Sequence, residues 1–190
     1  MKRIVIFASG SGTNAENLIN FFFNSENASV IKVLTNNPDA KVIERCKKLN
    51  VSTLIFDKEA FLQSNDILNI LKSLNTDLIV LAGFLWKFPE FILKEFENKV
   101  INIHPALLPK YGGKGMYGLR VHEAVVQNNE NETGITIHYV NENYDEGAII
   151  FQAKCEVTKT DTANNIAAKI HKLEMEHFPR VVKSLLFPNE

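Results

Sequence analysis

Short, continuous apolar runs alternate with amphipathic stretches along residues 3–104. The run Asp77–Ala82, for example, is apolar at every position after its first. A strand of this kind is buried on both faces, which is typical of parallel sheets. Parallel strands need long crossover connections, and the amphipathic stretches between the runs have the spacing of such helices. The pattern therefore predicts an α/β protein.

The predicted elements give the expected architecture. The predicted strands are Arg3–Ala8, Val30–Thr35, Thr53–Phe56, Asp77–Ala82, Val100–His104, Thr133–Val140 and Ala148–Val157. The predicted helices are Thr13–Asn24, Asp39–Leu49, Pro89–Phe96, Leu119–Asn128 and Thr162–Leu186, and the stretch Glu59–Leu74 is predicted to be mostly helical. The last two strands are expected to add to the sheet as a hairpin. We therefore predict a Rossmann-like, mostly parallel twisted sheet of about seven strands with helices on both faces.

Length and composition narrow the class of protein further. The 190 residues, of which 45% are apolar, predict one domain over 1–190. The net charge of −1 argues against a nucleic-acid binder. No apolar run approaches a membrane span or a signal peptide. Two isolated cysteines, Cys46 and Cys155, predict free thiols. We expect a cytoplasmic protein that binds small molecules and is a monomer or a homodimer.

A glycine-rich loop lies between the first strand and the first helix. Glycines let the backbone approach an anion, and the N–H groups that begin a helix bind phosphate. The loop, with Gly12, Thr13 and Asn14, also fits the dinucleotide pattern Gly-x-Gly-x-x-Gly/Ala. An NAD site expects an acidic residue after the second strand, where this chain has Asn36. The loop favours a phosphate site over an NAD site, and a plain strand–helix turn is the third interpretation.

Asn102 and His104 are two positions apart on one predicted strand, so they share a face, and Ile101 and Ile103 take the other. The pair comes at the carboxyl end of a parallel strand, where open α/β sheets bind ligands. An amide and an imidazole can stabilise an oxyanion, and histidine can transfer protons. On the residues alone, catalytic and structural roles are equally supported.

Two further segments have a functional and a structural interpretation. Asp145, followed by Glu146 and Gly147, is an ordinary turn sequence. A carboxylate at that position, placed against His104, would raise the pKa of the imidazole. The hydrophobic stretch around Trp86 would suit a flat aromatic ligand or would pack on the body of the protein.

The remaining motifs exclude two classes of enzyme. The other histidines show no zinc-ligand spacing, so we predict no metal; they are His122, His138, His171 and His177. Ser9 and Ser11 lack a Gly-x-Ser-x-Gly elbow, which argues against a serine hydrolase.

These motifs together resemble those of the folate-dependent phosphoribosylglycinamide formyltransferases. The resemblance covers essentially residues 1–188. Its motifs are Ser9-Gly10-Ser11-Gly12-Thr13-Asn14, Leu81-Ala82-Gly83-Phe84, Asn102-Ile103-His104-Pro105-Ala106-Leu107-Leu108-Pro109-Lys110-Tyr111 and Asp145-x-Gly147. It implies transfer of a formyl group from 10-formyltetrahydrofolate, the cosubstrate, to the amine of 5-phosphoribosyl-glycinamide in purine biosynthesis.

The resemblance also implies a role for particular residues. Asn102, His104 and Asp145 would be catalytic. Gly12, Thr13 and Asn14 would hold the substrate phosphate, and Glu174 with His171 would contact its ribose and glycinamide end. The folate would be bound by Lys58, Leu85, Trp86, Lys87, Phe88, Asn102, Asn141 and Tyr144.

The chain departs from the family at three places. Trp86 stands where arginine is common, Gly112–Arg120 is longer than in many members, and Glu146 replaces a smaller residue. The glycines of the longer segment suggest a mobile lid. The alternatives are another formyl-folate transferase or hydrolase of the same fold, an NAD-binding oxidoreductase, and a non-catalytic phosphate-ligand binding protein.

Overall fold

The seven strands of the protein form a single sheet in a computed structural model that describes residues 1–189. The spatial order is β3-β2-β1-β4-β5-β6-β7, with the first five strands parallel and the last two antiparallel. The strands are β1 (Lys2–Phe7), β2 (Ala28–Thr35), β3 (Thr53–Ile55), β4 (Leu78–Leu81), β5 (Val100–His104), β6 (Glu132–Tyr139) and β7 (Ile149–Glu156). The Rossmann-like α/β fold predicted from the sequence is confirmed.

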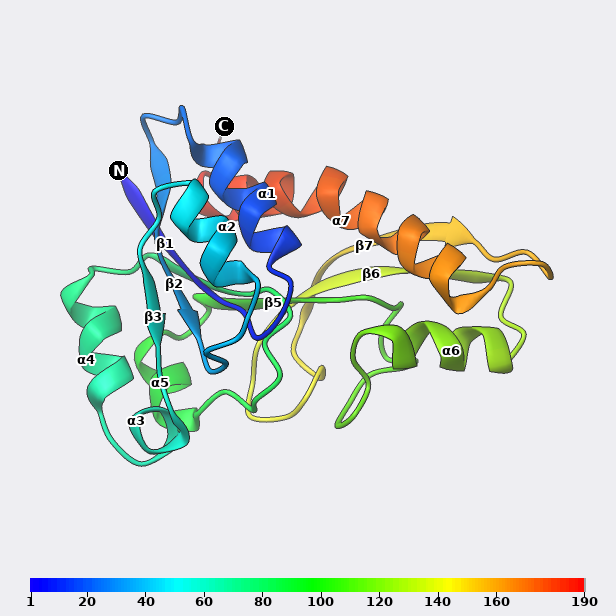
Figure 1. The fold of residues 1–190 in the computed structure, drawn as a ribbon, viewed down its shortest axis with the longest axis horizontal. Helices are drawn as coiled ribbons and strands as arrows, with labels where there is room; N and C mark the ends of the chain where they lie inside the picture. Colours follow the sequence, from blue (N-terminus) through cyan, green and yellow to red (C-terminus); the bar gives the residue numbers. More distant parts are fainter. Residues whose placement is uncertain (190) are drawn as a thin grey trace.

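Helices cover both faces of this sheet, as Figure 1 shows. They are α1 (Thr13–Phe22), α2 (Val42–Lys48), α3 (Lys58–Leu62), α4 (Asp66–Ser73), α5 (Glu90–Glu95), α6 (Leu119–Gln127) and α7 (Ala163–Leu186). Buried side chains of α1, α2 and α7 pack on one face, and those of α3, α4 and α5 pack on the other. Helix α6 packs against α7.

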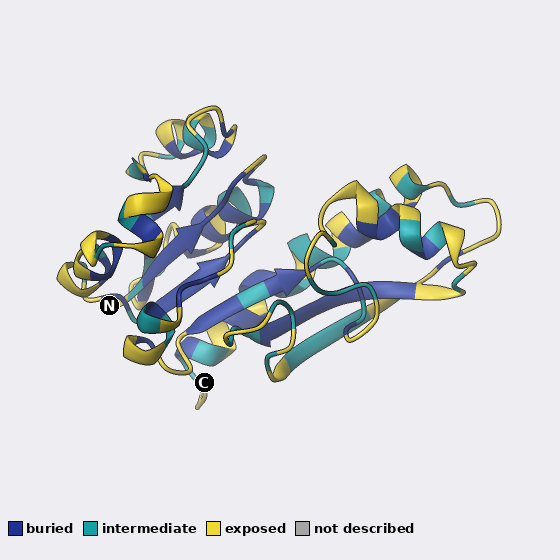
Figure 2. Cartoon of the chain, turned by 90° about the horizontal axis from the view of Figure 1, so that it is seen from below, coloured by how far each residue is buried: buried dark blue, intermediate teal, exposed yellow. Residues whose placement is uncertain are grey.

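The strand alternation divides the buried side chains between two hydrophobic cores. Ile4 and Ile6 of β1 point into the core under α1 and α7, whereas Val5 and Phe7 point into the core under α3–α5. Figure 2 shows the result, with the buried colour concentrated along the strands and the exposed colour on the outer helix faces and loops. All four of these β1 side chains are fully buried.

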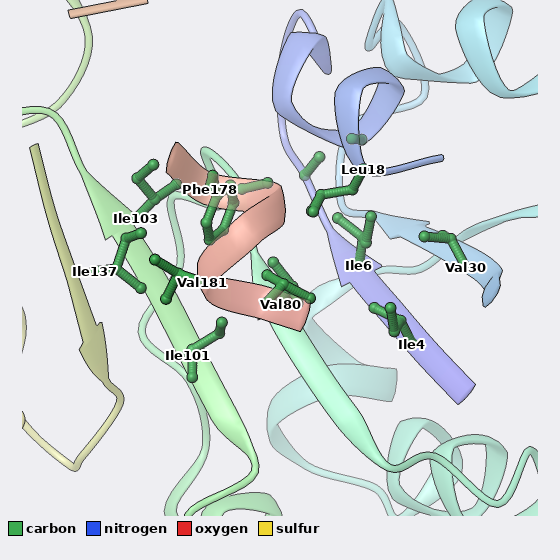
Figure 3. Packing of buried hydrophobic residues seen from close by; sticks show 14 of the residues in the cluster. Ile4, Ile6, Leu18, Val30, Val80, Ile101, Ile103, Ile137, Phe178 and Val181 are labelled. Carbon is green, nitrogen blue, oxygen red and sulfur yellow. The ribbon is translucent and has the colours of Figure 1, made fainter. Parts of the chain in front are cut away.

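The face that β5 turns toward α7 is apolar. Ile101 and Ile103 point toward Phe178 and Val181 of α7 in Figure 3. Because side chains alternate along a strand, Asn102 and His104 lie on the opposite face. The antiparallel pairing of β5 with β6 then places Asn102 opposite His138.

The stretch Glu59–Leu74 is mostly helical, as predicted, and the structure divides it into the two helices α3 and α4. The Ser64 hydroxyl accepts the N–H of Asp66 (3.2 Å) and donates to its carboxylate (2.8 Å). Such local side-chain bonds compete with helix continuation. The predicted helix Asp39–Leu49 is also shorter than expected, since α2 begins at Val42.

The long last helix agrees with its predicted stripe. Ile166, Ile170, Phe178 and Val181 are buried in the core, and Leu173 and Leu185 are partly buried against it. Within residues 1–189, no helix is long and apolar enough to cross a membrane.

Candidate active site

A cavity of about 700 Å³ opens at the carboxyl ends of the parallel strands. Its walls come from the loop after β1, the loop after β4, the end of β5, the segment from Gly113 to Arg120, and one side of α7. This is the edge at which open α/β sheets bind ligands, and the volume suits a small molecule. Ten of the predicted site residues line it, namely Gly12, Thr13, Asn14, Leu85, Asn102, His104, Tyr144, Asp145, His171 and Glu174.

The loop after β1 presents unused N–H groups to this cavity. Gly12 precedes α1 in the left-handed conformation (φ 72°), and no side chain caps the helix. A Cβ at Gly12 would overlap the Val42 side chain and its Cα, so the close approach of α2 requires glycine here. The first N–H groups of a helix have no partner within it. The loop can therefore bind an anion at the N-terminus of α1.

Asn36 stands where an NAD site would have an acidic residue, and it has a structural role in this protein. Ser9 donates its hydroxyl to the Asn36 side-chain oxygen (2.6 Å), and the same hydroxyl accepts the N–H of Leu85 (3.1 Å). The Ser9 N–H also donates to the Gly83 carbonyl (3.1 Å). Asn36 thus helps to tie the glycine loop to the loop after β4, which supports the phosphate interpretation over the NAD one.

Asn102, His138 and Asp145 form one cluster, of which Asn102 and Asp145 line the main cavity. The Asn102 side-chain nitrogen donates to Asp145 Oδ1 (3.3 Å) and lies 3.1 Å from His138 Nε2. His138 Nδ1 donates to the Tyr139 carbonyl (2.8 Å), and its Nε2 also lies 3.6 Å from Asp145 Oδ1. Asp145 also accepts the N–H of Gly113 at Oδ2 (2.9 Å). Groups from β5, from β6 and from the segment at Gly113 therefore surround one carboxylate.

His104 lies on the other side of that carboxylate. Its Nε2 donates to the Tyr111 carbonyl (2.8 Å), and its Nδ1 is 3.5 Å from Asp145 Oδ2. The ring is 3% exposed. Because Nε2 is committed to the backbone, a proton taken up by the neutral ring would be placed at Nδ1, between the imidazole and Asp145.

The expectation that Asp145 raises the pKa of His104 is wrong for the net shift. Burial lowers the pKa of His104 below 6.5, and it outweighs the opposite effects of Asp145 and the Tyr111 carbonyl. Burial alone would raise the pKa of Asp145, but contacts with His138, His104 and the Gly113 N–H hold it below 3.8. At neutral pH the pair is therefore an ionised carboxylate beside a neutral imidazole.

Glu174 and His171 extend the cavity wall along α7. Their side chains approach each other, with His171 Nδ1 3.8 Å from Glu174 Oε2. Burial raises the pKa of Glu174 from 4.5 to about 7, while contact with the Asn14 side chain acts in the opposite direction. The Asn14 side-chain oxygen is buried without a partner within residues 1–189. Asn14 thus brings an unpartnered oxygen, and Glu174 a buried carboxyl group, to the same cavity.

Glu174→Gln is expected to stabilise the protein in a pH-dependent way. A carboxyl whose folded pKa is raised destabilises the fold as the pH rises from the unfolded value, here 4.5, to about 7. The full shift corresponds to about 3 kcal/mol above pH 7. Denaturant unfolding of both proteins at pH 5 and pH 8 measures the difference, which should be larger at pH 8.

Glu176→Gln is the matched control on α7. Glu176 lies 3.7 Å from Arg180, and its side chain is 56% exposed. It should show no growing advantage over the wild type between the two pH values. A stability difference for Glu174→Gln that is equal at pH 5 and pH 8 would contradict burial of an ionisable Glu174.

A second, smaller hollow of about 50 Å³ adjoins the main cavity. Its wall includes the predicted folate residues Trp86, Lys87, Phe88 and Asn141. Four residues line both cavities, namely Phe84, Asn102, Tyr144 and Asp145. The Asn102–Asp145 hydrogen bond therefore lies where the main cavity meets this smaller hollow.

Two of the predicted folate residues, Trp86 and Lys58, contact an aromatic cluster behind the smaller hollow. Trp86 packs in an aromatic cluster with Phe56 and Phe61, at ring-centroid distances of 6.0 Å. Lys58 lies over the Trp86 ring at 5.7 Å and lines neither cavity. The cluster thus packs against the Trp86 ring of the loop after β4, and Lys58 makes a cation–π contact with the same ring.

Sequence reasoning missed two histidines of the site. His138 was set aside because it has no metal-ligand partner nearby in the sequence, yet the β5–β6 register brings it to Asn102. His122, at the start of α6, lines the main cavity, and burial together with His104 lowers its pKa. The sequence predicts a strand at His138 but does not predict that this strand pairs with β5, so it held no signal for the contact with Asn102. Within residues 1–189, no group of three or more His, Cys, Asp or Glu side chains is arranged to hold a metal ion.

The fold and the site together define a Rossmann-like transferase with a phosphate loop and a buried Asn–His–Asp cluster. The chain belongs to the formyl transferase family, which matches residues 2–182. A relative from Bacillus subtilis, phosphoribosylglycinamide formyltransferase, is 37% identical over 98% of this chain and 95% of its own length.

Two further comparisons extend this result. The chloroplastic phosphoribosylglycinamide formyltransferase of Arabidopsis thaliana is 34% identical over 92% of this chain, which spans 63% of that relative's length. The crystal structure of phosphoribosylglycinamide formyltransferase from Bacillus halodurans has a TM-score of 0.87 and 34% identity, and it covers 100% of this chain and 97% of that one.

Proposed function

We propose that this protein transfers the formyl group of 10-formyltetrahydrofolate to the amine of 5-phosphoribosyl-glycinamide, a step of purine biosynthesis. The observation that carries the proposal is the position of the Asn102–Asp145 hydrogen bond at the junction of the two cavities. A group transfer between two substrates needs its reacting atoms at such a junction. The names of the relatives described above support the same reaction.

The ribonucleotide is assigned to the glycine-loop end of the main cavity. The uncapped N–H groups around Gly12, Thr13 and Asn14 suit its phosphate. Glu174 and His171 lie beyond them, where the ribose and the glycinamide end would follow. The free Asn14 oxygen is available to a donor of the substrate.

The folate is assigned to the side of the cavities formed by the loop after β4 and the 141–145 loop. Leu85 is 46% exposed in the main cavity, and Lys87, Asn141 and Tyr144 line the smaller hollow. Trp86 and Phe88 contribute as the aromatic support of this wall. Lys58 is assigned to its rim, where the negatively charged tail of a folate would emerge.

The reaction then follows from the cluster. The substrate amine attacks the formyl carbon, a C–N bond forms, and the carbonyl oxygen becomes an oxyanion. The Asn102 amide stabilises that oxyanion by exchanging one of its two present hydrogen bonds. Neutral His104 takes up the amine proton at Nδ1 beside Asp145, and the proton passes to the folate nitrogen as its bond to the formyl carbon breaks.

One incubation tests this proposal against its alternatives. The protein is mixed with 10-formyltetrahydrofolate and glycinamide ribonucleotide, and formation of the deformylated folate is followed. We expect turnover that requires both substrates. Loss of formyl without the ribonucleotide would indicate a hydrolase, and binding without turnover would indicate a binding protein. A saturable enhancement of NADH fluorescence would favour the oxidoreductase.

We further propose that residues 1–190 act as a single domain and that each chain carries a complete site, in a monomer or a homodimer. The single continuous seven-stranded sheet supports the single domain. Cys46 and Cys155 are free thiols, which supports a reducing compartment such as the cytoplasm.

A further inference from the structure

Helix α2 holds three consecutive residues of the glycine loop by three different contacts. The Arg45 Nε–H donates to the Ser11 carbonyl (2.8 Å). The Val42 N–H donates to the Gly10 carbonyl (3.2 Å), and the Val42 side chain occupies the space where a Cβ of Gly12 would stand. None of these contacts was predicted from the sequence.

The two carbonyl contacts fix the direction of the neighbouring N–H groups. In a trans peptide unit the C=O and the following N–H point in opposite directions. Anchoring the carbonyls of Gly10 and Ser11 on α2 therefore turns the N–H groups of Ser11 and Gly12 away from α2, toward the cavity that these residues line. An anion site made of backbone donors depends on this orientation.

Arg45 is itself held in place by an acidic partner. A terminal guanidinium nitrogen of Arg45 forms an ion pair with the Glu16 carboxylate in the first turn of α1. One planar guanidinium thus joins α2, the loop and α1, which is a geometry that lysine cannot reproduce. Arg45 does not line the cavity, so it acts on a ligand through Ser11.

We propose that Arg45 is a positioning residue for the substrate phosphate, which sets the orientation of the glycine-loop N–H groups by binding the Ser11 carbonyl. This inference rests on the proposed function of the loop as the ribonucleotide phosphate site. Arg45 is not expected to take part in the formyl transfer itself, because it lies on α2 whereas Asn102 lies on β5 and Asp145 in the loop before β7.

The test is the kinetics of Arg45→Ala. Loss of a pre-set phosphate site removes binding that substrate and transition state share, so KM for the ribonucleotide rises with kcat unchanged. We expect an increase of about tenfold or more in that KM, from loss of a charge-assisted hydrogen bond. KM for 10-formyltetrahydrofolate should stay within about twofold of wild type. Arg45→Lys keeps the charge without the planar fork and should recover only part of the loss.

Lys48→Ala is the matched control. It removes a positive charge from the same helix at an exposed side chain outside both cavities, and its kinetics should equal those of the wild type. Thermal unfolding of each variant accompanies the kinetics. An unchanged ribonucleotide KM in Arg45→Ala overturns the inference. So does an equal loss for both substrates that follows a large fall in Tm.

A binding measurement keeps the inference apart from the proposed reaction. Calorimetric titration with ribose 5-phosphate compares wild type and Arg45→Ala without any formyl transfer. Weaker binding by the variant supports the positioning role even if the wild type proves inactive with glycinamide ribonucleotide. Equal binding by both proteins overturns the role, whatever the reaction proves to be.

Discussion

His104→Ala and Asn102→Ala are expected to lower kcat about 10²–10³-fold each, which is the usual cost of losing one oxyanion donor or proton-transfer group. His104 is the group placed to hold a proton beside Asp145, and Asn102 is the amide at the junction of the two cavities. Single-turnover formyl transfer measures the effect on the chemical step. Near-wild-type turnover in either variant would remove that residue from the reaction.

Asp145→Asn is a conservative substitution that tests the third catalytic candidate alongside His104→Ala and Asn102→Ala. Asp145 has a left-handed backbone (φ 58°), which asparagine tolerates well, so the loop should keep its shape. The amide cannot stabilise a protonated His104 as a carboxylate does, and kcat should fall while both KM values change little. Unfolding curves should show that all three variants remain folded. A collapse of stability would point to a structural role instead.

Gly147→Ala is expected to reduce kcat about 100-fold and the free energy of unfolding by about 2–4 kcal/mol. A Cβ at this position would overlap the Tyr139 carbonyl and come within 3.5 Å of His138 Nδ1. The Tyr139 carbonyl is the acceptor that fixes the His138 ring. The added methyl group must therefore displace the strand end that holds the catalytic cluster.

Glu146→Ala tests whether the losses of kcat and stability in Gly147→Ala come from the close contact between residue 147 and the Tyr139 carbonyl. Glu146 is the adjacent residue and is exposed. Its truncation should leave stability within about 0.5 kcal/mol of wild type and leave kcat nearly unchanged. Activity and denaturant midpoints measured in parallel decide the question. Equal losses in the two variants would show that any change in this loop is harmful.

The strand that carries the candidate site was predictable because local rules agree there. The predicted strand Val100–His104 matches β5 at both ends, and its apolar and polar faces follow from alternation alone. The stretch Glu59–Leu74 is mostly helical as predicted, but periodicity does not show the break between α3 and α4, where the Ser64 hydroxyl binds the Asp66 N–H. The strands were therefore easier to place than the interruption of a helix.

The rest of the site depends on contacts between distant segments. His138 reaches Asn102 only through the β5–β6 register, and Arg45 reaches Ser11 across 34 positions of sequence. The pKa of His104 is lowered by burial, whereas the neighbouring Asp145 carboxylate taken alone would raise it. The sequence identifies which groups are present, whereas their partners and protonation states require the packed structure.

The antiparallel pairing of β5 with β6 has a consequence for how such a protein can change over time. The hydrogen-bond ladder between β5 and β6 sets the separation of Asn102 and His138. A one-residue slip of either strand would turn its side chains to the opposite face of the sheet. The intervening turn between Gly115 and Gly118 takes no part in that ladder. Insertions or deletions in this turn can alter what the cavity admits while the reacting groups keep their separation. Substrate preference and chemistry are thus free to evolve at different rates.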